Sequence, residues 1–521
     1  MKQFFKSKIE DGQIVNFIFI VFSIASIAWS LYFARATITL PYQIGFREGQ
    51  PQVLTQMLLD GENPYTFDNQ PLAYNVYSIS YSAAVLPFAS LFGNTIHIHR
   101  LVTFVFIFLS TLLGFGVVYK SNKNFAYALI CASFIMIGFM GRGGLGSAPS
   151  AMGTFLFYSA LFIPFLKSFD KISLWISLFF ALWAFYTKAY FVLSFGIVFA
   201  YVFLFISKRK AFSYFISFFT LLMISAVVIR LIFPLYFINS IGGNISNTFR
   251  TFENLYEQVV DLLRYFFPLI IATFLMLKFT SRAENPLPIK DWKIKDIFNA
   301  SWSAPVFTGQ MNYFLFAFLT AFFVYITFLA THVGNYLTYA YEMVLPPFFF
   351  WLFTKFEFKR WIGTITALLI IFNLTYWQNI TLNPNMLEQR NSTEWQKLYA
   401  FIKPSLKILS TPIVTSRLIE LGITPVDSGQ TDYYYFMKPY PDYAWFGPPY
   451  AEFYAHGEAY AQSINEAIKN QEYDLIITAK DVDVFYDSRL ITQYYSLEKQ
   501  LILYMNQTEQ KWVAQIWKPN K

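Results

Sequence analysis

The sequence predicts a polytopic α-helical membrane protein with about eleven transmembrane helices, followed by a C-terminal soluble α/β domain. Of its 521 residues, 56% are hydrophobic and 21% aromatic, whereas only 13% are charged, about half the usual share for a soluble protein. The 62 Phe and 36 Tyr would overfill the cores of the roughly three domains that this length suggests. We therefore expect lipid to cover much of the apolar surface.

Charge divides the chain near residue 380. Residues 1–380 contain 26 basic and 15 acidic residues, and residues 381–521 contain 13 and 16. The first part also contains repeated apolar runs of about 15 to 23 residues, which suits a hydrocarbon layer roughly 30 Å thick. We predict a transmembrane domain over 1–380 and a soluble domain over 381–521. The predicted spans are 14–34, 101–119, 125–141, 151–166, 172–187, 189–207, 212–236, 259–278, 312–331, 341–356 and 360–378.

The basic residues predict the orientation, because Lys and Arg near helix ends stay on the cytoplasmic side. Alternate loops hold 18 of the 26 basic residues of the first part. We therefore predict a multi-pass protein of the plasma (inner) membrane, or of the endoplasmic reticulum membrane if the chain is eukaryotic. Its N-terminus is expected in the cytoplasm and its C-terminal domain outside. The basic residues that this rule leaves on the external side are Arg35, Arg47, Arg100, Arg142, Lys188, Arg230, Arg250 and Arg264.

The longest external segment is the loop of residues 35–100, which is too long to be a simple connector. Two stretches in it, Val53–Leu59 and Tyr77–Phe92, are amphipathic or moderately apolar. We expect them to lie along the membrane interface. Such a loop would roof a cavity on the outer face.

Helical and strand patterns alternate in the tail, which indicates an α/β domain. It has no GxGxxG or P-loop pattern, so nothing supports a nucleotide site. The predicted helices are Ser392–Ile402 and Tyr460–Lys469, the predicted strands are Lys407–Ser410, Ile413–Ser416, Leu475–Thr478 and Trp512–Trp517, and Tyr433–Tyr454 is a predicted loop.

Glu48 is the first candidate for chemistry, since it stands just beyond the outer end of the first predicted helix. A carboxylate in a partly dry pocket at the membrane boundary is suited to general-base catalysis. The alternative is a solvated loop acid paired with Arg47. Asp60 directly precedes a Gly-Glu-Asn-Pro turn and Glu62 lies within it. Both are second-choice acids.

Two cations at outer helix ends, Arg142 and Lys188, could together bind a lipid phosphate. Snorkelling toward lipid headgroups is the alternative reading of each one. His332, Tyr339 and Glu342 lie between the ninth and tenth predicted helices and could line a polar site, although tyrosines are expected at the interface anyway. His97 and His99 come without a carboxylate cluster, so we predict no structural zinc.

Together these features resemble the type C (GT-C superfamily) glycosyltransferases, membrane enzymes that use polyprenyl-phosphate or dolichyl-phosphate sugars. The resemblance spans most of the chain, from the cytoplasmic start to the outer α/β tail. Its loose motifs are Glu48 after the first helix, Gly61-Glu62-Asn63-Pro64-Tyr65, Arg100 at the start of the second helix, Thr187-Lys188, and the His332 to Tyr339 loop before Leu345-Pro346-Pro347.

The resemblance implies that Glu48 is the catalytic base and that Lys188, Arg142 and Arg100 hold the donor phosphate. Many members have an acid near the start of the fourth helix, where this chain reads Ser147-Ala148-Pro149-Ser150. Many also have a second acid in the first loop. Asp60 or Glu62 could be that second acid. The other residues expected to bind substrate are Arg47, His332, Tyr339 and Glu342, together with Asp60 and Glu62.

The reaction that the resemblance implies moves a sugar from a polyprenyl-phosphate donor to an acceptor hydroxyl on a glycan, lipid or protein, with inversion. It requires no nucleotide, no protein-bound metal and no nucleic acid. Whether a divalent cation takes part stays open. Two other classes stay open. One is a lipid or polysaccharide transporter or flippase, although the sequence has no internal repeat of the kind that transporters show. The other is a non-catalytic glycan-assembly protein.

Overall fold

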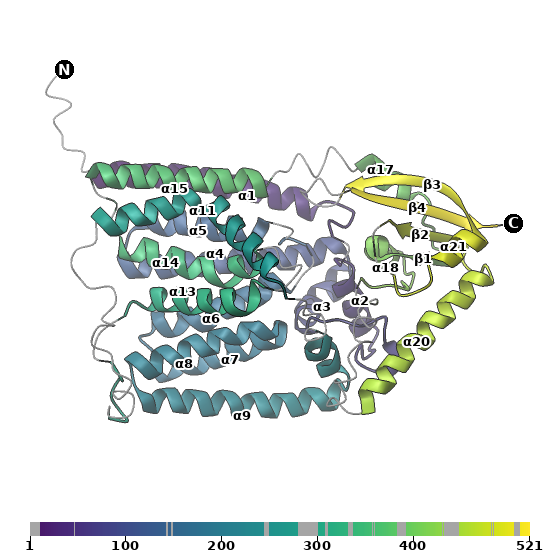
Figure 1. Ribbon diagram of the computed structural model, residues 1–521, viewed down its shortest axis with the longest axis horizontal. Helices are drawn as coiled ribbons and strands as arrows, with labels where there is room; N and C mark the ends of the chain where they lie inside the picture. Colours follow the sequence, from purple (N-terminus) through teal and green to yellow (C-terminus); the bar gives the residue numbers. More distant parts are fainter. Residues whose placement is uncertain are drawn as a thin grey trace, which may run out of the picture.

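The computed structural model describes residues 11–45, 47–141, 144–146, 149–243, 250–279, 301–307, 311–331, 337–356, 358, 360–382, 392–429, 431, 448–480, 482, 484–504 and 511–520. Its long helices lie side by side in a bundle, and a small β-sheet lies beyond one end of that bundle (Figure 1). The helices of the 35–100 loop lie between the bundle and the sheet (Figure 1). We call this end of the bundle the sheet end.

The bundle is built from apolar helices, and several of the described ones begin at a capping side chain. Side chains of Thr95, Asn124, Asp170, Ser207 and Asn312 each accept a backbone N–H of the first turn that follows, which satisfies donors that a helix cannot satisfy itself. The bundle helices are α1 (Asp11–Ile38), α4 (Ile96–Asn122), α5 (Phe125–Met140), α6 (Ser150–Leu166), α7 (Lys171–Thr187), α8 (Leu193–Phe205), α9 (Lys208–Ile232), α11 (Phe252–Phe279), α13 (Tyr313–Val324), α14 (Leu345–Lys355) and α15 (Arg360–Thr381).

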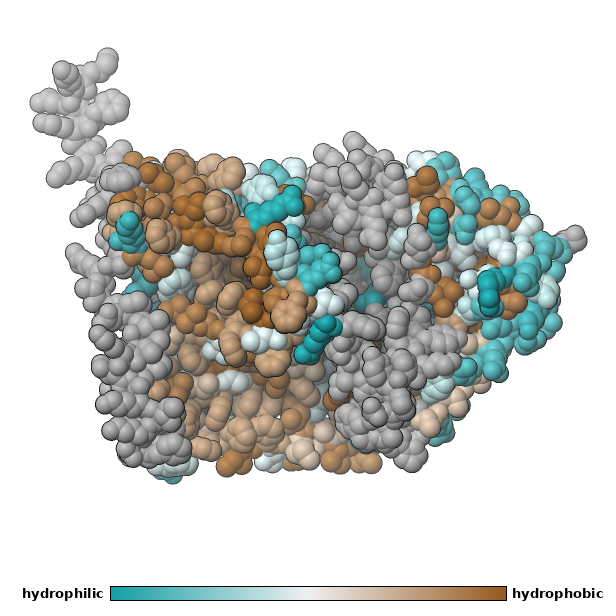
Figure 2. All heavy atoms as spheres, in the orientation of Figure 1, coloured by the Kyte–Doolittle hydropathy of each residue, from teal (hydrophilic) through white to brown (hydrophobic). Residues whose placement is uncertain are grey.

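Each predicted span falls on one of these helices. Of the described helices, 4 are long and apolar enough to cross a membrane, namely α1, α4, α9 and α11. The other bundle helices do not combine that length with that apolarity, so the number of crossings stays a prediction. Apolar side chains dominate the surface of the bundle, whereas polar ones dominate around the sheet (Figure 2). This is the surface of a helical membrane protein.

The first loop forms α2 (Gln50–Leu59), the short 3₁₀ turn η2 (Phe67–Asn69) and α3 (Ser80–Phe92). It is tied to the neighbouring helix ends by polar contacts. Ser80 Oγ donates to Tyr186 O at the end of α7, at 2.9 Å. Asn63 Nδ2 donates to Ile232 O at the end of α9, at 2.7 Å. The loop therefore packs over the ends of α7 and α9.

The tail contains a four-stranded sheet in the order β1-β2-β4-β3. β1 pairs with β2 in parallel, and the other two pairings are antiparallel. The prediction of strand for Ile413–Ser416 is wrong, because Pro412–Val414 forms a 3₁₀ turn (η9) and Thr415–Glu420 forms α18. The other elements are α17 (Ser392–Tyr399), β1 (Ile408–Ser410), α20 (Pro448–Lys469), β2 (Leu475–Ala479), α21 (Arg489–Tyr494), β3 (Tyr495–Tyr504) and β4 (Lys511–Pro519).

The tail docks directly on the first loop. Gln43 Nε2 donates to Pro412 O at 3.1 Å, and Gln43 Oε1 accepts from Ser416 N at 2.9 Å. Gly49 lies so close to α18 that a β-carbon there would come within 2.6 Å of Thr415 Cβ. The predicted Tyr433–Tyr454 loop lies mostly outside the described residues, and its last part is helical because α20 begins at Pro448.

Candidate active site

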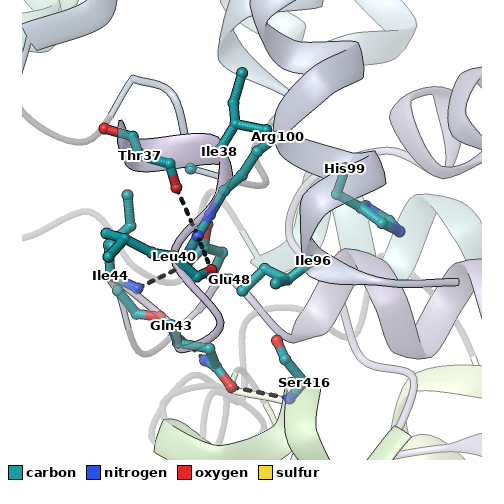
Figure 3. Close-up of polar contacts among 12 residues, drawn as sticks. Thr37, Ile38, Leu40, Gln43, Ile44, Glu48, Ile96, His99, Arg100 and Ser416 are labelled. Carbon is teal, nitrogen blue, oxygen red and sulfur yellow. Dashed lines mark hydrogen bonds and ion pairs between the residues drawn. The ribbon is translucent and has the colours of Figure 1, made fainter. Parts of the chain in front are cut away.

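Glu48 and Arg100 form a buried ion pair where the first loop meets the bundle (Figure 3). Arg100 Nε donates to Glu48 Oε1 at 2.7 Å and Nη2 donates to Glu48 Oε2 at 2.9 Å. Ile44 N donates to the same Oε2 at 2.7 Å. The side chain of Arg100 is 0% exposed and that of Glu48 is 3% exposed. This two-pronged geometry is the strong form of a carboxylate–guanidinium contact.

The guanidinium of Arg100 also caps the C-terminal end of α1. Nη1 donates to Thr37 O at 2.9 Å and to Leu40 O at 2.7 Å, and Nη2 donates to Tyr42 O at 2.7 Å. Carbonyl groups at a helix end lack intrahelical donors, and a cation there is favourable. All five N–H donors of Arg100 are thus used inside the chain, which leaves it no N–H group for a phosphate.

Lys188 lies in a second cluster, at the sheet end of α7. It is the C-cap of that helix, directly before the 3₁₀ turn η4 (Ala189–Val192). Its ammonium donates to Ser150 Oγ at the start of α6. The ring centroids of Tyr77 and Tyr190 lie 5.0 and 5.5 Å from Nζ, within the range of cation–π attraction.

Glu342 faces Lys188 in this cluster, and their side chains are only 6% and 9% exposed. Glu342 belongs to the π-helical turn η8 (Ala340–Val344) before α14. Its Oε1 lies 3.6 Å from Lys188 Nζ, beyond hydrogen-bonding distance, while its Oε2 accepts from the Tyr190 hydroxyl. Among the described residues, Oε1 has no hydrogen-bond donor.

The Lys188 cluster is therefore only partly satisfied by its own neighbours. An ammonium carries three N–H donors, and among the described residues the Lys188 ammonium makes one hydrogen bond. Buried charges normally use their full hydrogen-bonding capacity, because desolvation otherwise costs several kcal/mol. Within the described part of the chain, the Lys188 ammonium therefore has hydrogen-bonding capacity left, beside a carboxylate oxygen that contacts it only as a 3.6 Å ion pair. This arrangement is suited to a polar ligand.

The cavity at Lys188 is small. Its volume is about 20 Å³, and its lining includes Lys188, Ser78, Tyr186, Thr187 and Ser240. That is room for roughly one water molecule.

The other predicted site residues are spread over several places. Arg142 and His332 lie outside the described residues. Tyr339 joins the Lys188 cluster, since its ring packs edge-on against Tyr190 at 4.7 Å. Asp60 and Glu62 are exposed in the turn after α2, where Asp60 accepts from Gln56 Nε2 at 3.1 Å.

Arg47 is half-buried in the turn before α2, and its Nε is shielded from solvent. The predicted alternative for Glu48, a solvated acid paired with Arg47, is wrong. Glu48 is buried, and it is Arg100 that pairs with it.

Three partners of Lys188 were not predicted: Ser150, Tyr77 and Tyr190. Ser150 carries the most informative signal, because it stands in the segment where the resemblance expects an acid. A hydroxyl there accepts from the ammonium without neutralising it. Tyr190 comes two residues after Lys188, so the local sequence already placed a hydroxyl near the cation.

The two histidines in the first turn of α4 are each within hydrogen-bonding distance of an oxygen, one at the end of α1 and one just before α4. His97 Nδ1 lies 2.6 Å from Ile38 O, and His99 Nε2 lies 3.0 Å from Asn94 Oδ1. His99 points away from Arg100 (Figure 3). Within the described part of the chain, the His, Cys, Asp and Glu side chains form no group of three or more that could hold a metal ion.

The helical membrane bundle, with its long first loop and its sheet at one end, has the architecture of a type C glycosyltransferase. The solved structure that it resembles is ArnT from Cupriavidus metallidurans bound to undecaprenyl phosphate. The match has a TM-score of 0.50 and 12% sequence identity and covers 95% of this chain and 97% of that chain. The apo state of the same protein matches with a TM-score of 0.49 and 11% identity, over the same shares of the two chains.

Sequence comparisons give no further relatives. No protein-family model matches the chain, and no curated protein matches it either. At 12% identity the likeness shows the GT-C fold alone.

Proposed function

We propose that this protein is a glycosyltransferase that moves a sugar from a polyprenyl-phosphate donor to an acceptor hydroxyl. The observation that carries the proposal is the ammonium of Lys188, whose side chain is 9% exposed. Among the described residues this ammonium makes one hydrogen bond, to Ser150, and one longer ion-pair contact, to Glu342. The leaving group of such a reaction is a lipid phosphate, which needs a cation at the membrane boundary. The undecaprenyl phosphate bound by the similar protein supports a lipid phosphate as ligand.

The proposed chemistry assigns separate tasks to Lys188 and Glu48. The acceptor hydroxyl attacks the anomeric carbon from the face opposite the phosphate, so that the anomeric configuration inverts. The bond between that carbon and the phosphate oxygen breaks, and Lys188 stabilises the charge of the departing phosphate. Glu48 takes the proton of the hydroxyl as general base. Arg142 is the proposed second cation of the phosphate site.

We propose a positioning role for Arg100 instead of the predicted contact with phosphate. Its five N–H groups are all engaged, and they tie the carboxylate of Glu48 to the end of α1. A bidentate guanidinium keeps a carboxylate in one orientation. This fixes the side chain that the proposal names as base, while leaving the phosphate to Lys188.

The site is proposed to lie on the extracytoplasmic face of an inner or plasma membrane. The chain enters α1 at the end of the bundle opposite the sheet (Figure 1). The retention of basic residues on the cytoplasmic side therefore supports a cytoplasmic N-terminus, with the first loop and a C-terminal domain of residues 381–521 outside. Acceptors on that face are glycans, lipids and protein side chains, and the domain of residues 1–380 would carry the chemistry.

A release assay tests the proposed class. Purified protein is given a panel of radiolabelled undecaprenyl-phosphate sugars together with a lipid extract that supplies acceptors, and free undecaprenyl phosphate is measured. An enzyme releases it in step with transfer to the acceptor. A transporter, flippase or non-catalytic assembly protein leaves every donor of the panel intact, which would contradict the proposal.

A further inference from the structure

A second cavity lies at the other end of α7, between the first turns of α7 and α9. Its volume is about 440 Å³, which is within the range of small-molecule sites. α7 begins at Lys171 and ends at Thr187 beside Lys188. This cavity, which we call the basic groove, therefore lies about 25 Å from the Lys188 cluster at 1.5 Å per residue. It plays no part in the proposed transfer.

The lining of the basic groove combines three cations with hydroxyl groups. Lys171 comes from α7, and Arg209 and Lys210 come from α9. All three side chains are exposed, and Ser213 and Ser217 continue the lining along α9. None of the described residues that line the groove is acidic.

Among the residues that the structure describes, Asp170 is an acid close to the basic groove. Its carboxylate is the N-cap of α7, where it accepts from Ser173 N at 2.7 Å. With its charge included, the described residues at the groove still carry a net positive charge. This composition suits a phosphate headgroup.

The remaining wall of the groove is mostly apolar, with Trp175 exposed and Leu174 and Leu178 buried behind it. Trp175 is 48% exposed, and Leu178 lies one turn further along α7. The most apolar window of α9 is only 6% buried, so that helix has a lipid-facing surface. A ligand held here would have its charged end among Lys171, Arg209 and Lys210 and its apolar end along Trp175.

We propose that the basic groove binds an anionic phospholipid of the bilayer, by its phosphate headgroup. The positive charge favours an anionic headgroup over a zwitterionic one, and the apolar wall favours a lipid over a free phosphate. In the orientation proposed above, the groove lies in the cytoplasmic leaflet, where anionic headgroups interact with basic clusters. Such a lipid would pack across α7 and α9 at the end opposite the donor site.

Lipid binding can be measured by native mass spectrometry of the purified protein. The probes are phosphatidylglycerol and phosphatidylcholine with the same acyl chains. The test variant is Arg209→Gln with Lys210→Gln, in which two exposed charges are removed. The matched control is Lys120→Gln with Lys123→Asn, which removes two charges at the same end of the bundle, outside the groove. Asn suits Lys123 because its φ is 57°.

The wild-type protein should bind phosphatidylglycerol in preference to phosphatidylcholine. The test variant should bind phosphatidylglycerol on the order of 30-fold more weakly, as expected for two cations near a charged lipid, while the control keeps wild-type affinity. Glycerol 3-phosphate should not compete, and Trp175→Ala should weaken binding of both lipids. Equal binding of the two lipids by the wild type, or an unchanged preference in the test variant, would overturn the proposal.

Discussion

Arg100 at the start of α4 holds Glu48 of the first loop in a buried, two-pronged ion pair, across 52 positions of sequence. The same guanidinium caps the end of α1. The pair therefore joins three segments that are far apart in the chain. Its position also places a fixed carboxylate at the boundary between the bundle and the loop.

Glu48→Gln should reduce both transfer and stability. The amide cannot neutralise Arg100, and an unpaired buried charge destabilises a protein by about 3 to 5 kcal/mol. We expect a clear fall in the melting temperature in detergent, together with loss of transfer by the fraction that stays folded. Glu62→Gln, at an exposed position, is the control and should change the melting temperature little. A Glu48→Gln protein with normal stability and turnover would refute both roles.

Glu342→Gln should distinguish the role of Glu342 from that of Glu48. It removes the negative charge that lies 3.6 Å from the Lys188 ammonium, so a donor phosphate no longer competes with it. We expect several-fold tighter binding of undecaprenyl phosphate, with transfer kept within about tenfold of wild type. If transfer is lost while affinity is unchanged, Glu342 rather than Glu48 is the base.

Gly49→Ala should loosen the contact between the first loop and the tail. Its new methyl group would lie 2.6 Å from Thr415 Cβ and 3.1 Å from the backbone nitrogen of Ser416. Overpacking of this kind costs about 1 to 3 kcal/mol, which should appear as a lower melting temperature. Gly45→Ala is the matched control, because a β-carbon added there would meet no atom within 4 Å. Equal melting temperatures for the two variants would show that the contact is not tight.

Asp427 should make the stability of the tail depend on pH. Burial raises the pKa of this carboxyl to about 6, although Gly429 N donates to it. Between the unfolded pKa of 3.8 and this value, the folded state holds the proton that the unfolded state has released. The free energy of unfolding should therefore fall as the pH rises from about 4 to 6.5, by about 3 kcal/mol in total.

Asp427→Asn provides the comparison for that pH dependence. The amide oxygen still accepts from Gly429 N, but it carries no charge at any pH. The variant should be more stable than wild type at pH 7.5 and should lose this part of the slope between pH 4 and 6.5. Identical unfolding profiles for the two proteins would show that Asp427 is ionised in the folded state throughout this range.

The bundle could be predicted because its signal is local. A long apolar run has the same meaning wherever it occurs, so each predicted span falls on a helix. In the tail the strand β3 was missed, because Glu498, Lys499 and Gln500 interrupt its apolar pattern. β3 is an edge strand of the sheet, where exposed charged residues are normal. The start of α20 was missed because Pro448 and Pro449 suggested a break, although proline is tolerated in a first helical turn.

Single residues of the site could be predicted, but their contacts could not, because the contacting residues come from distant segments of the chain. Glu48 and Lys188 could be identified from the sequence because each is a charged residue at the end of a predicted helix. Nothing in the local sequence pairs Glu48 with Arg100 rather than with its neighbour Arg47, since the choice depends on how α1 and α4 pack. For the same reason, Ser150 could not be assigned to Lys188 before α6 and α7 were placed side by side.

The role of Lys188 as the phosphate ligand can be measured through binding of undecaprenyl phosphate, because this binding does not depend on knowing the sugar or the acceptor. The affinities of wild-type protein, Lys188→Ala and Lys188→Arg are compared for undecaprenyl phosphate and for undecaprenol, which lacks the phosphate. Removing a partly buried charge-assisted contact should weaken binding of the phosphate about 10-fold to 100-fold in Lys188→Ala, with partial recovery in Lys188→Arg and no change for undecaprenol. Equal affinity of wild type and Lys188→Ala for undecaprenyl phosphate would show that Lys188 does not bind the donor phosphate.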